Sequence, residues 1–310
     1  MSAHAEKVIE VSDLVVEYKT DGGKLIRAVD GLNLSVRRGE VVGFIGPNGA
    51  GKSTCIKVLM GFRTPTRGTV RVMGLPAGDM RGRRQVGFLP EVALYYPFLT
   101  ARETLRMFAK LREIPRARRE AVIDELLAKV KLSGRDREPV RGFSKGMLQR
   151  VGIAQAIMGD PDLLILDEVT SGLDPVARYD VRRILMDFKA KGKTVFFSSH
   201  ELSEVTMLCD RVILIDEGRV LVEDQLAALS GAMRRHIVKV DGLHSPPELP
   251  ADVFIHAVSN GQTTFSAENG EARDALLAML EVDGLVPQAA YEEPGSLEDY
   301  FVHSIGHKVS

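Results

Sequence analysis

Short hydrophobic runs recur along residues 1–225, and polar residues or glycine follow each of them. Runs of this length are too short for a helix and are typical of buried strands in a parallel sheet. Between the runs, hydrophobic residues recur at the three- and four-residue intervals of an amphipathic helix. The pattern predicts an α/β fold around a parallel sheet. The runs that we assign to its buried strands are residues 41–45, 86–89, 163–166 and 194–197.

The beginning of the chain follows a different pattern, with segments that favour half-exposed strands. Two short hydrophobic segments, 8–11 and 14–16, predict two strands, and a turn is expected at 21–23. Hydrophobic and polar residues then alternate over 32–36, which predicts a further strand. The first 45 residues are therefore expected to be rich in β structure. A later hairpin is predicted from the segments 212–215 and 220–222.

Helical spacing dominates residues 91–160. Thr100 and Glu103 match the capping box that begins a helix, and a largely buried helix is expected over 149–158. We therefore expect a helical insert, at about 91–160, within an α/β domain that spans residues 1–225.

The character of the chain changes after residue 225. Asn260 and Gly261 form the dipeptide that most strongly favours a tight hairpin. Helices are expected over 272–280 and 296–303, and we find no motif with a chemical role. Residues 226–310 are therefore predicted to form a small α+β accessory domain.

A glycine-rich loop lies between the strand 41–45 and a helical segment that follows it. In that context, glycines let backbone N–H groups turn toward phosphate oxygens, and the start of the helix adds a positive end. We expect Lys52 to reach the β- and γ-phosphates and the Ser53 hydroxyl to bind Mg²⁺. The alternative is a glycine-rich turn that binds nothing, which the context disfavours. The residues assigned to the nucleotide are Gly46, Pro47, Asn48, Gly49, Ala50, Gly51, Lys52, Ser53 and Thr54.

Two acidic residues, Asp167 and Glu168, follow the buried run 163–166, and His200 follows the run 194–197. Open α/β sheets bind ligands at the carboxyl ends of their parallel strands. Asp167 is placed to hold Mg²⁺ through water, and Glu168 to orient or activate a water molecule. Alone, such residues would be read as solvated acids and a structural histidine. Together with the phosphate-binding loop, they predict a site for nucleotide hydrolysis.

The composition sets the broad class of the protein. Charged residues make up 27% and hydrophobic residues 45%, as is usual for a soluble globular protein, and a net charge of -1 gives no reason to expect nucleic acid as a partner. Cys55 and Cys209 match neither a metal site nor a disulfide framework, which fits a reducing cytosol. No apolar run is long enough to span a membrane, so we expect any membrane role to go through a partner.

Three aromatic residues lie close together just before the expected helices: Tyr95, Tyr96 and Phe98. Such a cluster either belongs to the core or forms a contact surface for a partner. The pattern leaves both interpretations open.

At this point the motifs resemble, in identity and order, those of the ATP-binding subunits of ABC transporters, over residues 8–225. The phosphate-binding loop and residues 163–168 resemble the Walker motifs, and residues 143–150 resemble the signature sequence in its export-type variant. Residues 171–175 resemble the D-loop and His200 the switch histidine. Tyr18 falls where this family stacks an aromatic ring on adenine, although its pattern alone favours a half-buried strand residue.

The resemblance implies a P-loop ATPase core with an antiparallel β subdomain and a helical subdomain. It implies ATP and Mg²⁺ as cofactors, and a dimer that encloses the nucleotides. Catalytic roles fall to Lys52, Glu168 and His200. The residues that it assigns to ATP besides the loop are Tyr18, Ser144, Gly146 and Asp174.

Two positions depart from the family pattern: Val169 stands where a proline is common, which we expect to be harmless, and Glu91 stands where a glutamine is usual. A carboxylate can still bind Mg²⁺, but it brings a negative charge close to the γ-phosphate. The predicted metal ligands are therefore Ser53, Asp167 and Glu91.

The resemblance also implies partners. These are a second ATPase subunit, identical or related, and a separate polytopic membrane permease that would hold the protein at the cytoplasmic, inner face of the cell membrane. Residues 296–301 resemble the tail of ATPases that serve multidrug, polysaccharide or lipid exporters, so export is expected. The alternative is a soluble ABC-type ATPase that acts as a nucleotide-dependent switch without transport.

Overall fold

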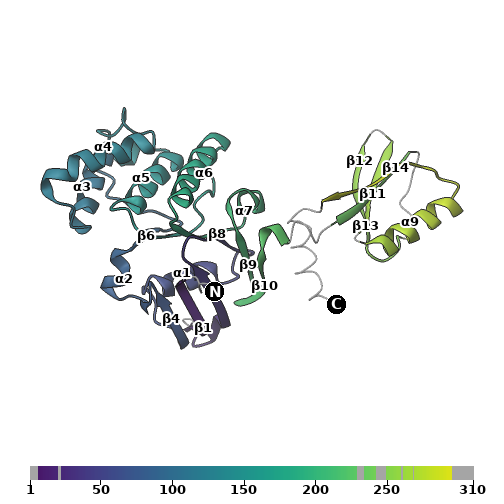
Figure 1. Ribbon diagram of the computed structural model, residues 1–310, viewed down its shortest axis with the longest axis horizontal. Helices are drawn as coiled ribbons and strands as arrows, with labels where there is room; N and C mark the ends of the chain where they lie inside the picture. The colour runs from purple at the N-terminus through teal and green to yellow at the C-terminus, as the bar shows by residue number, and fades with distance from the viewer. Residues whose placement is uncertain are drawn as a thin grey trace, which may run out of the picture. The chain divides into compact units, whose positions relative to one another are not determined.

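The computed structural model describes residues 6–19, 22–228, 234–241, 249–259, 261–267 and 269–294. It divides into two compact units, Met1–Gln225 and Leu226–Ser310, each built around its own sheets (Figure 1). Among the described residues, no helix combines the length and the apolar character needed to cross a membrane.

A six-stranded sheet forms the centre of the first unit, with strand order β10-β9-β3-β8-β7-β6. The five strands from β9 to β6 are parallel, and only β10 runs antiparallel, as the second strand of a hairpin with β9. This arrangement confirms the predicted α/β fold, its four buried strands and the hairpin. The strands are β3 Val41–Ile45, β6 Val86–Leu89, β7 Leu163–Leu166, β8 Thr194–Ser199, β9 Arg211–Asp216 and β10 Arg219–Gln225.

A second, antiparallel sheet has the order β2-β1-β4-β5. The two strands predicted at 8–11 and 14–16 are in fact one strand, because Asp13 takes a left-handed φ of 49° and the pairing register shifts between Val11 and Leu14. The irregularity lets both hydrophobic segments face the core within one strand. The strands are β1 Lys7–Lys19, β2 Leu25–Arg37, β4 Arg67–Val72 and β5 Leu75–Pro76.

One hydrophobic core joins this sheet to the central one. Val16 of β1 and Phe44 of β3 are fully buried in it, together with Ile56 of helix α1, Lys52–Leu59. Burial of such side chains stabilises the fold by roughly 1.5–3 kcal/mol each. The core therefore fixes α1, and the loop before it, against both sheets.

The expected helical insert is present between β6 and β7. Its third helix begins at Lys145 rather than near Gln149, because the Ser144 hydroxyl accepts a hydrogen bond from the Met147 N–H and caps the helix four residues earlier. Gly146 thus lies in the first turn, not before the helix. The helices of the insert are α3 Ala101–Leu111, α4 Arg119–Lys129 and α5 Lys145–Ile157, with short 3-10 turns at η1 Arg116–Arg118 and η2 Val140–Gly142, and α2 Met80–Arg84 precedes β6.

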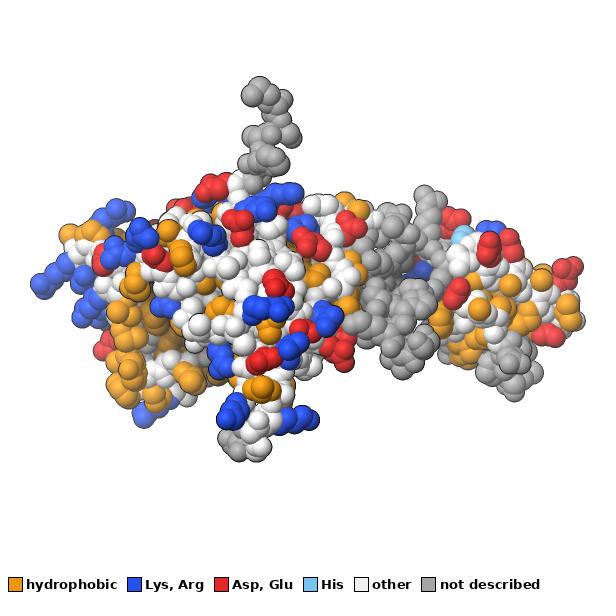
Figure 2. Space-filling model, turned by 90° about the horizontal axis from the view of Figure 1, so that it is seen from below, with side chains coloured by type: hydrophobic (Ala, Val, Ile, Leu, Met, Phe, Trp, Pro, Cys, Tyr) orange, Lys and Arg blue, Asp and Glu red, His pale blue; other side chains and the backbone are white. Residues whose placement is uncertain are grey.

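The segment before α3 exposes hydrophobic side chains to solvent. Leu94, Tyr96 and Phe98 are 90%, 57% and 68% exposed, whereas Tyr95 is partly buried and packs edge-on against Phe108 of α3. Figure 2 shows hydrophobic side chains gathered on the side of this unit that carries α2 and α3. Of the three aromatic residues, Tyr95 therefore belongs to the core, while Tyr96 and Phe98 form an exposed surface with Leu94, which we call the 94–98 surface.

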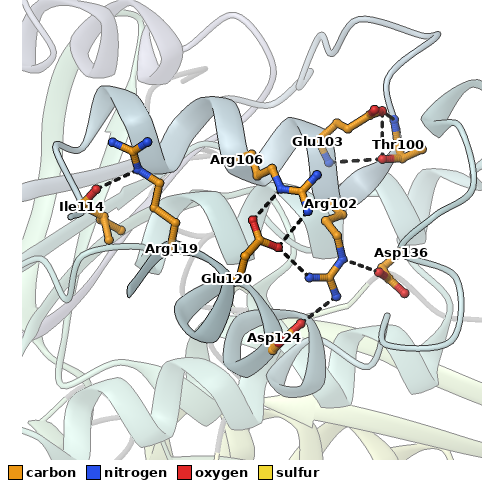
Figure 3. Close-up of polar contacts among 9 residues, drawn as sticks. All are labelled: Thr100, Arg102, Glu103, Arg106, Ile114, Arg119, Glu120, Asp124 and Asp136. Carbon is orange, nitrogen blue, oxygen red and sulfur yellow. Dashed lines mark hydrogen bonds and ion pairs between the residues drawn. The ribbon is translucent and has the colours of Figure 1, made fainter. Parts of the chain in front are cut away.

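Ion pairs join α3 to α4 (Figure 3). Arg102 of α3 donates hydrogen bonds to Glu120, Asp124 and the buried Asp136, and Arg106 donates two to Glu120. The hydrogen bond from Arg106 is the main reason that the pKa of Glu120 falls to about 2. At the start of α3, the predicted capping box between Thr100 and Glu103 is formed.

Two more helices complete the first unit: α6, Pro175–Ala190, and α7, Leu202–Leu208. The helix α6 begins with a proline and is capped by Asp174, whose carboxylate accepts a hydrogen bond from the Ala177 N–H. Each of these helices follows a loop that comes directly after a central strand, so both begin at the carboxyl edge of the sheet.

The second unit is a four-stranded antiparallel sheet with one described helix packed on it. Val238, Phe265 and Leu276 are fully buried between sheet and helix. The predicted hairpin strands and the helix over 272–280 are confirmed, whereas Asn260 and the predicted helix 296–303 lie outside the described residues. The elements are β11 Arg234–Asp241, β12 Val253–Ser259, β13 Gln262–Ala267, α9 Gly270–Val282 and β14 Pro287–Pro294, in the order β12-β13-β11-β14.

Candidate functional site

The glycine-rich loop connects β3 to α1, as its sequence context predicted. Gly51 caps α1 with a φ of 105°, and a Cβ there would stand 2.4 Å from the Ala28 carbonyl oxygen. At Gly46, a Cβ would come within 2.1 Å of the Ile215 carbonyl oxygen. Only glycine fits at these two positions without a shift of the main chain.

Lys52 is the first residue of α1 and is only 5% exposed. Its ammonium group donates hydrogen bonds to the carbonyl oxygens of Gly46 at 2.7 Å and Pro47 at 3.1 Å. The Glu168 Oε1 lies 3.5 Å from the same nitrogen. The loop thus folds around a buried positive charge, which is the group that a phosphate would meet.

Asp167 follows β7 and is buried beside the start of α1. Its Oδ1 accepts hydrogen bonds from the Ser53 hydroxyl at 3.2 Å and the Ser198 hydroxyl at 2.6 Å. A serine hydroxyl and a carboxylate are the hard oxygen ligands that Mg²⁺ prefers, and Mg²⁺ usually adds phosphate and water oxygens to them. The residues therefore fit this metal, although the described residues include no group of three or more His, Cys, Asp and Glu side chains that could hold one.

Glu168 has an unusual main-chain conformation, with a φ of 50°. A non-glycine residue in this region carries strain of about 1–3 kcal/mol and is often found at a functional site. Its side chain is buried, and its Oε2 lies 2.6 Å from the Nδ1 of His200, which is partly exposed at the end of β8. The structure thus brings both Lys52 and His200 into contact with Glu168, although the three residues come from separate segments.

These side chains open onto one cleft with a volume of about 480 Å³. Glu91 also lines it, so the residue that departs from the family pattern lies at the same site. The cleft has a largely polar wall, as expected for a charged ligand. The lining residues are Ala28, Asn48, Gly49, Gly51, Lys52, Ser53, Thr54, Glu91, Glu168, Ser171 and His200.

Tyr18 lies beside the loop but is not among the residues that line the cleft. Its hydroxyl is 3.3 Å from the Thr54 Oγ1, so either oxygen can donate to the other. The guanidinium of Arg63 sits 4.1 Å from the centre of the Tyr18 ring, and the same side chain donates to the Glu17 carbonyl oxygen. The ring is thereby held next to the phosphate-binding loop.

Three predicted ligands stand at helix starts outside this cleft: Ser144, Gly146 and Asp174. Ser144 and Asp174 are exposed and cap α5 and α6. A Cβ on Gly146 would meet Leu173 at 3.7 Å and Ala177 at 3.8 Å, so the two helix starts lie side by side. The chain therefore presents two separate groups of predicted ATP ligands.

Three residues at this site, Ala28, Ser171 and Ser198, were not among the predicted ligands. Ala28 of β2 lines the cleft, but an alanine in a strand gives no chemical signal. Ser198 follows the hydrophobic run 194–197, but a serine there gives no specific signal, and the pairing of β7 with β8 is needed to show that its hydroxyl contacts Asp167.

Comparisons with known proteins agree with this geometry. A family model described as ABC transporter matches residues 29–171. An ABC transporter ATP-binding protein of Nostoc sp. is 42% identical over 236 residues, which cover 75% of this chain and 70% of that protein. Nod factor export ATP-binding protein I of Rhizobium meliloti is 34% identical over 303 residues, which cover 96% of this chain and 88% of that protein.

Among solved structures, a dimeric ATP-binding cassette in a post-hydrolysis state, bound to ADP and Pi, superposes with a TM-score of 0.65 at 25% identity. The match covers 70% of this chain and 98% of that one. Together with the phosphate-binding loop and the acidic residues at the end of β7, these relationships settle the family. The chain belongs to the ABC transporter family, as an ATP-binding and ATP-hydrolysing subunit.

Proposed function

We propose that two such subunits pack head to tail around two ATP molecules, and that the second subunit is either an identical copy or a related chain. The observation that carries this proposal is the separation of the two groups of predicted ligands. The cleft holds Lys52, Glu168 and His200, whereas Ser144 and Gly146 lie at the exposed start of α5, outside the cleft. A helix start with free N–H groups favours an anion. Head-to-tail packing would place it against the γ-phosphate of the other subunit.

Within each cleft, the side chains divide the work of phosphoryl transfer to water. Lys52 neutralises the β- and γ-phosphates, Glu168 orients and polarises the attacking water, and His200 contacts the γ-phosphate. Ser53, Asp167 and Glu91 would hold Mg²⁺, which neutralises charge on the phosphates when it is bound. Tyr18 supports the adenine ring, and Asp174 approaches the nucleotide across the dimer.

The membrane partner is a polytopic permease, and the process is export. Support comes from the relative that is named as a Nod factor export protein and matches most of this chain. The 94–98 surface supplies exposed hydrophobic area of the kind that protein partners cover. Binding there would hold the ATPase at the cytoplasmic face of the cell membrane. Hydrolysis removes the γ-phosphate that bridges the subunits, and their separation is the movement that a permease can use.

The dimer is tested with Glu168→Gln, which should bind ATP without cleaving it and accumulate as a dimer in size-exclusion chromatography with MgATP. Gly146→Asp should bind ATP but stay monomeric, because its carboxylate meets phosphate. The space beside Gly146 accommodates a Cβ, so this variant should fold. A Glu168→Gln protein that remains monomeric in saturating MgATP, even with the cytoplasmic loops of the permease supplied, would contradict the proposal.

Mixing two inactive variants gives a sharper test. Lys52→Ala inactivates the cleft of its own subunit, and Gly146→Asp inactivates the start of α5 in its own subunit. A mixed dimer therefore keeps one complete site only if each cleft is completed by the α5 start of the other subunit. Some ATPase activity should therefore return on mixing, provided that one site suffices for turnover. Recovery should be absent when Lys52→Ala is mixed with Glu168→Gln, because both changes affect the same cleft.

A further inference from the structure

Ser198 lies between the two acidic residues that follow β7. It is the fifth residue of β8 and is fully buried. The strands β7 and β8 pair in parallel, with Leu166 opposite Phe197, so residue 198 stands beside the turn in which Asp167 and Glu168 lie. This place results from the pairing of two strands that are about 30 residues apart in sequence.

The Ser198 hydroxyl makes a hydrogen bond with each acidic residue. It donates to the Asp167 Oδ1 at 2.6 Å and accepts from the Glu168 backbone N–H at 2.9 Å. A serine hydroxyl has a single proton, and here that proton goes to the Asp167 carboxylate. The orientation of the hydroxyl is therefore fixed by both neighbours at once.

On the Asp167 side, the same carboxylate oxygen also accepts the Ser53 hydroxyl at 3.2 Å. Two hydroxyls on one oxygen set the rotation of the carboxylate about its Cβ–Cγ bond. They also set its direction relative to Ser53, the other proposed metal ligand at the start of α1. Removal of the shorter of these hydrogen bonds would leave the Asp167 carboxylate less well oriented.

On the Glu168 side, the hydrogen bond holds the main chain where it takes its left-handed φ of 50°. The Glu168 side chain projects from this main chain toward Lys52 and His200. A small change of the main chain would move the Glu168 carboxylate away from both. The one hydroxyl thus supports both acidic residues.

We propose that Ser198 is a positioning residue that orients Asp167 toward Mg²⁺ and Glu168 toward the attacking water. The inference rests on the proposed roles of those two acidic residues. The neighbouring Ser199 is almost equally buried, but its hydroxyl bonds only the backbone of Glu201 and supports neither carboxylate. The rival explanation is that Ser198 is an ordinary buried hydroxyl that stabilises the fold alone.

The test compares Ser198→Ala with Thr194→Val. Thr194 lies at the other end of β8, and its equally buried hydroxyl accepts a hydrogen bond only from the Gly39 N–H. ATP affinity is measured by calorimetry in EDTA and again with excess Mg²⁺. Ser198→Ala should bind ATP in EDTA within about twofold of wild type, yet its gain in affinity from Mg²⁺ and its kcat should each fall about 10- to 100-fold. Thr194→Val should match wild type both in its gain of ATP affinity from Mg²⁺ and in its kcat.

Two further variants complete the design. Ser198→Cys keeps a side chain of similar size, but its thiol is only a weak hydrogen-bond donor. It should therefore show the same loss in the gain from Mg²⁺ and in kcat, and it replaces Ser198→Ala if that variant does not fold. A variant that loses only thermal stability, with the wild-type gain from Mg²⁺ and wild-type turnover, would show that Ser198 is merely structural. An equal loss of affinity with and without Mg²⁺ would also overturn the proposal.

Asp167→Asn separates failure of this inference from failure of the proposed site. If Asp167→Asn loses the gain from Mg²⁺ and Ser198→Ala keeps it, only the role of Ser198 is wrong. If Asp167→Asn keeps the full gain, the metal role of Asp167 is wrong, and the inference about Ser198 falls with it.

Discussion

Lys52 shows how a single residue can be both buried and available to a ligand. Its ammonium group donates to two loop carbonyls and lies near Glu168, so the loop is shaped around a positive charge. We expect Lys52→Ala to weaken MgATP binding by about 10- to 150-fold, which corresponds to the roughly 1.5–3 kcal/mol of a hydrogen bond to a charged group. Calorimetry measures this directly.

The matched control is Lys57→Ala, because Lys57 is an exposed lysine on the same helix. Its affinity for MgATP should stay within about twofold of wild type, since a distant exposed charge is largely screened. Wild-type affinity in Lys52→Ala would show that the loop does not bind the phosphates through this residue.

Glu91 is the departure from the family pattern that changes the charge of the site. It is exposed and lines the cleft together with Glu168, so it adds negative charge where phosphate must bind. We expect Glu91→Gln to leave turnover unchanged or raise it by a few fold, because the change removes one repulsive charge near the γ-phosphate. Steady-state ATPase assays at low and high salt are the measurement, and any gain should shrink at high salt. A large fall in turnover would mean that the carboxylate itself is needed.

The residues of the site differ in how far the sequence could predict them. Asp167, Glu168 and His200 were predicted because each lies within three residues of the end of a buried hydrophobic run, and parallel strands bring such positions to one edge. Ser198 has the same kind of position, but serine is compatible with many roles. Its two hydrogen bonds depend on the register between β7 and β8, which the sequence pattern does not specify.

At the scale of elements, local sequence patterns predicted which strands and helices exist. Some of their ends differ from the prediction, because contacts in the folded structure determine them. The single strand β1 was split in the prediction because polar Ser12 and Asp13 interrupt its hydrophobic pattern, whereas in the structure Asp13 forms an irregularity without ending the strand. The start of α5 was placed too late because Gly146 is a poor helix former, yet the Ser144 cap outweighs it.

The junction of α3 and α4 depends on ion pairs of unequal burial. Arg102 contacts three carboxylates, and one of them, Asp136, is buried. We expect Arg102→Met to lower the free energy of unfolding by about 1–3 kcal/mol, because it leaves a buried charge without its partner. Arg84→Met is the control, since Arg84 and Glu113 form a largely exposed pair, and this change should cost less than about 1 kcal/mol. Denaturant titrations that give equal losses would contradict the expectation.

The same junction predicts a pH dependence. Hydrogen bonds from Arg106 and, to a smaller extent, from Arg102 lower the pKa of Glu120 from its ordinary value of 4.5 to about 2. A carboxylate with a lowered pKa in the folded state contributes stability above its unfolded pKa and loses it as the pH falls toward the folded value. The destabilisation caused by Arg106→Met should therefore be complete at pH 7 and shrink as the pH falls from about 4.5 to about 2. A loss that stays constant over that range would mean that Glu120 is not involved.

At the scale of the whole molecule, the predicted nucleotide site lies within only one of the two compact units. All residues that line the cleft, and the helix starts at Ser144 and Asp174, belong to the unit Met1–Gln225. The second unit has its own buried core around Val238 and Phe265, and its described residues carry none of the predicted site residues. The site therefore does not depend on the second unit for any of its known side chains.

We expect a chain that ends after Gln225 to fold and to bind MgATP within about threefold of the full-length protein. This end point keeps β10 whole, so the edge of the central sheet stays paired with β9. The second unit should instead matter for assembly or regulation, because it carries a separate core and its sequence contains no phosphate-binding motif. Calorimetry measures the affinity, and co-purification with the permease measures assembly. The truncated Lys52→Ala variant is the control, and it should lose binding as the full-length variant does. A truncated protein that is folded, as judged by a cooperative melting transition, but no longer binds MgATP would show that residues 226–310 complete the nucleotide site.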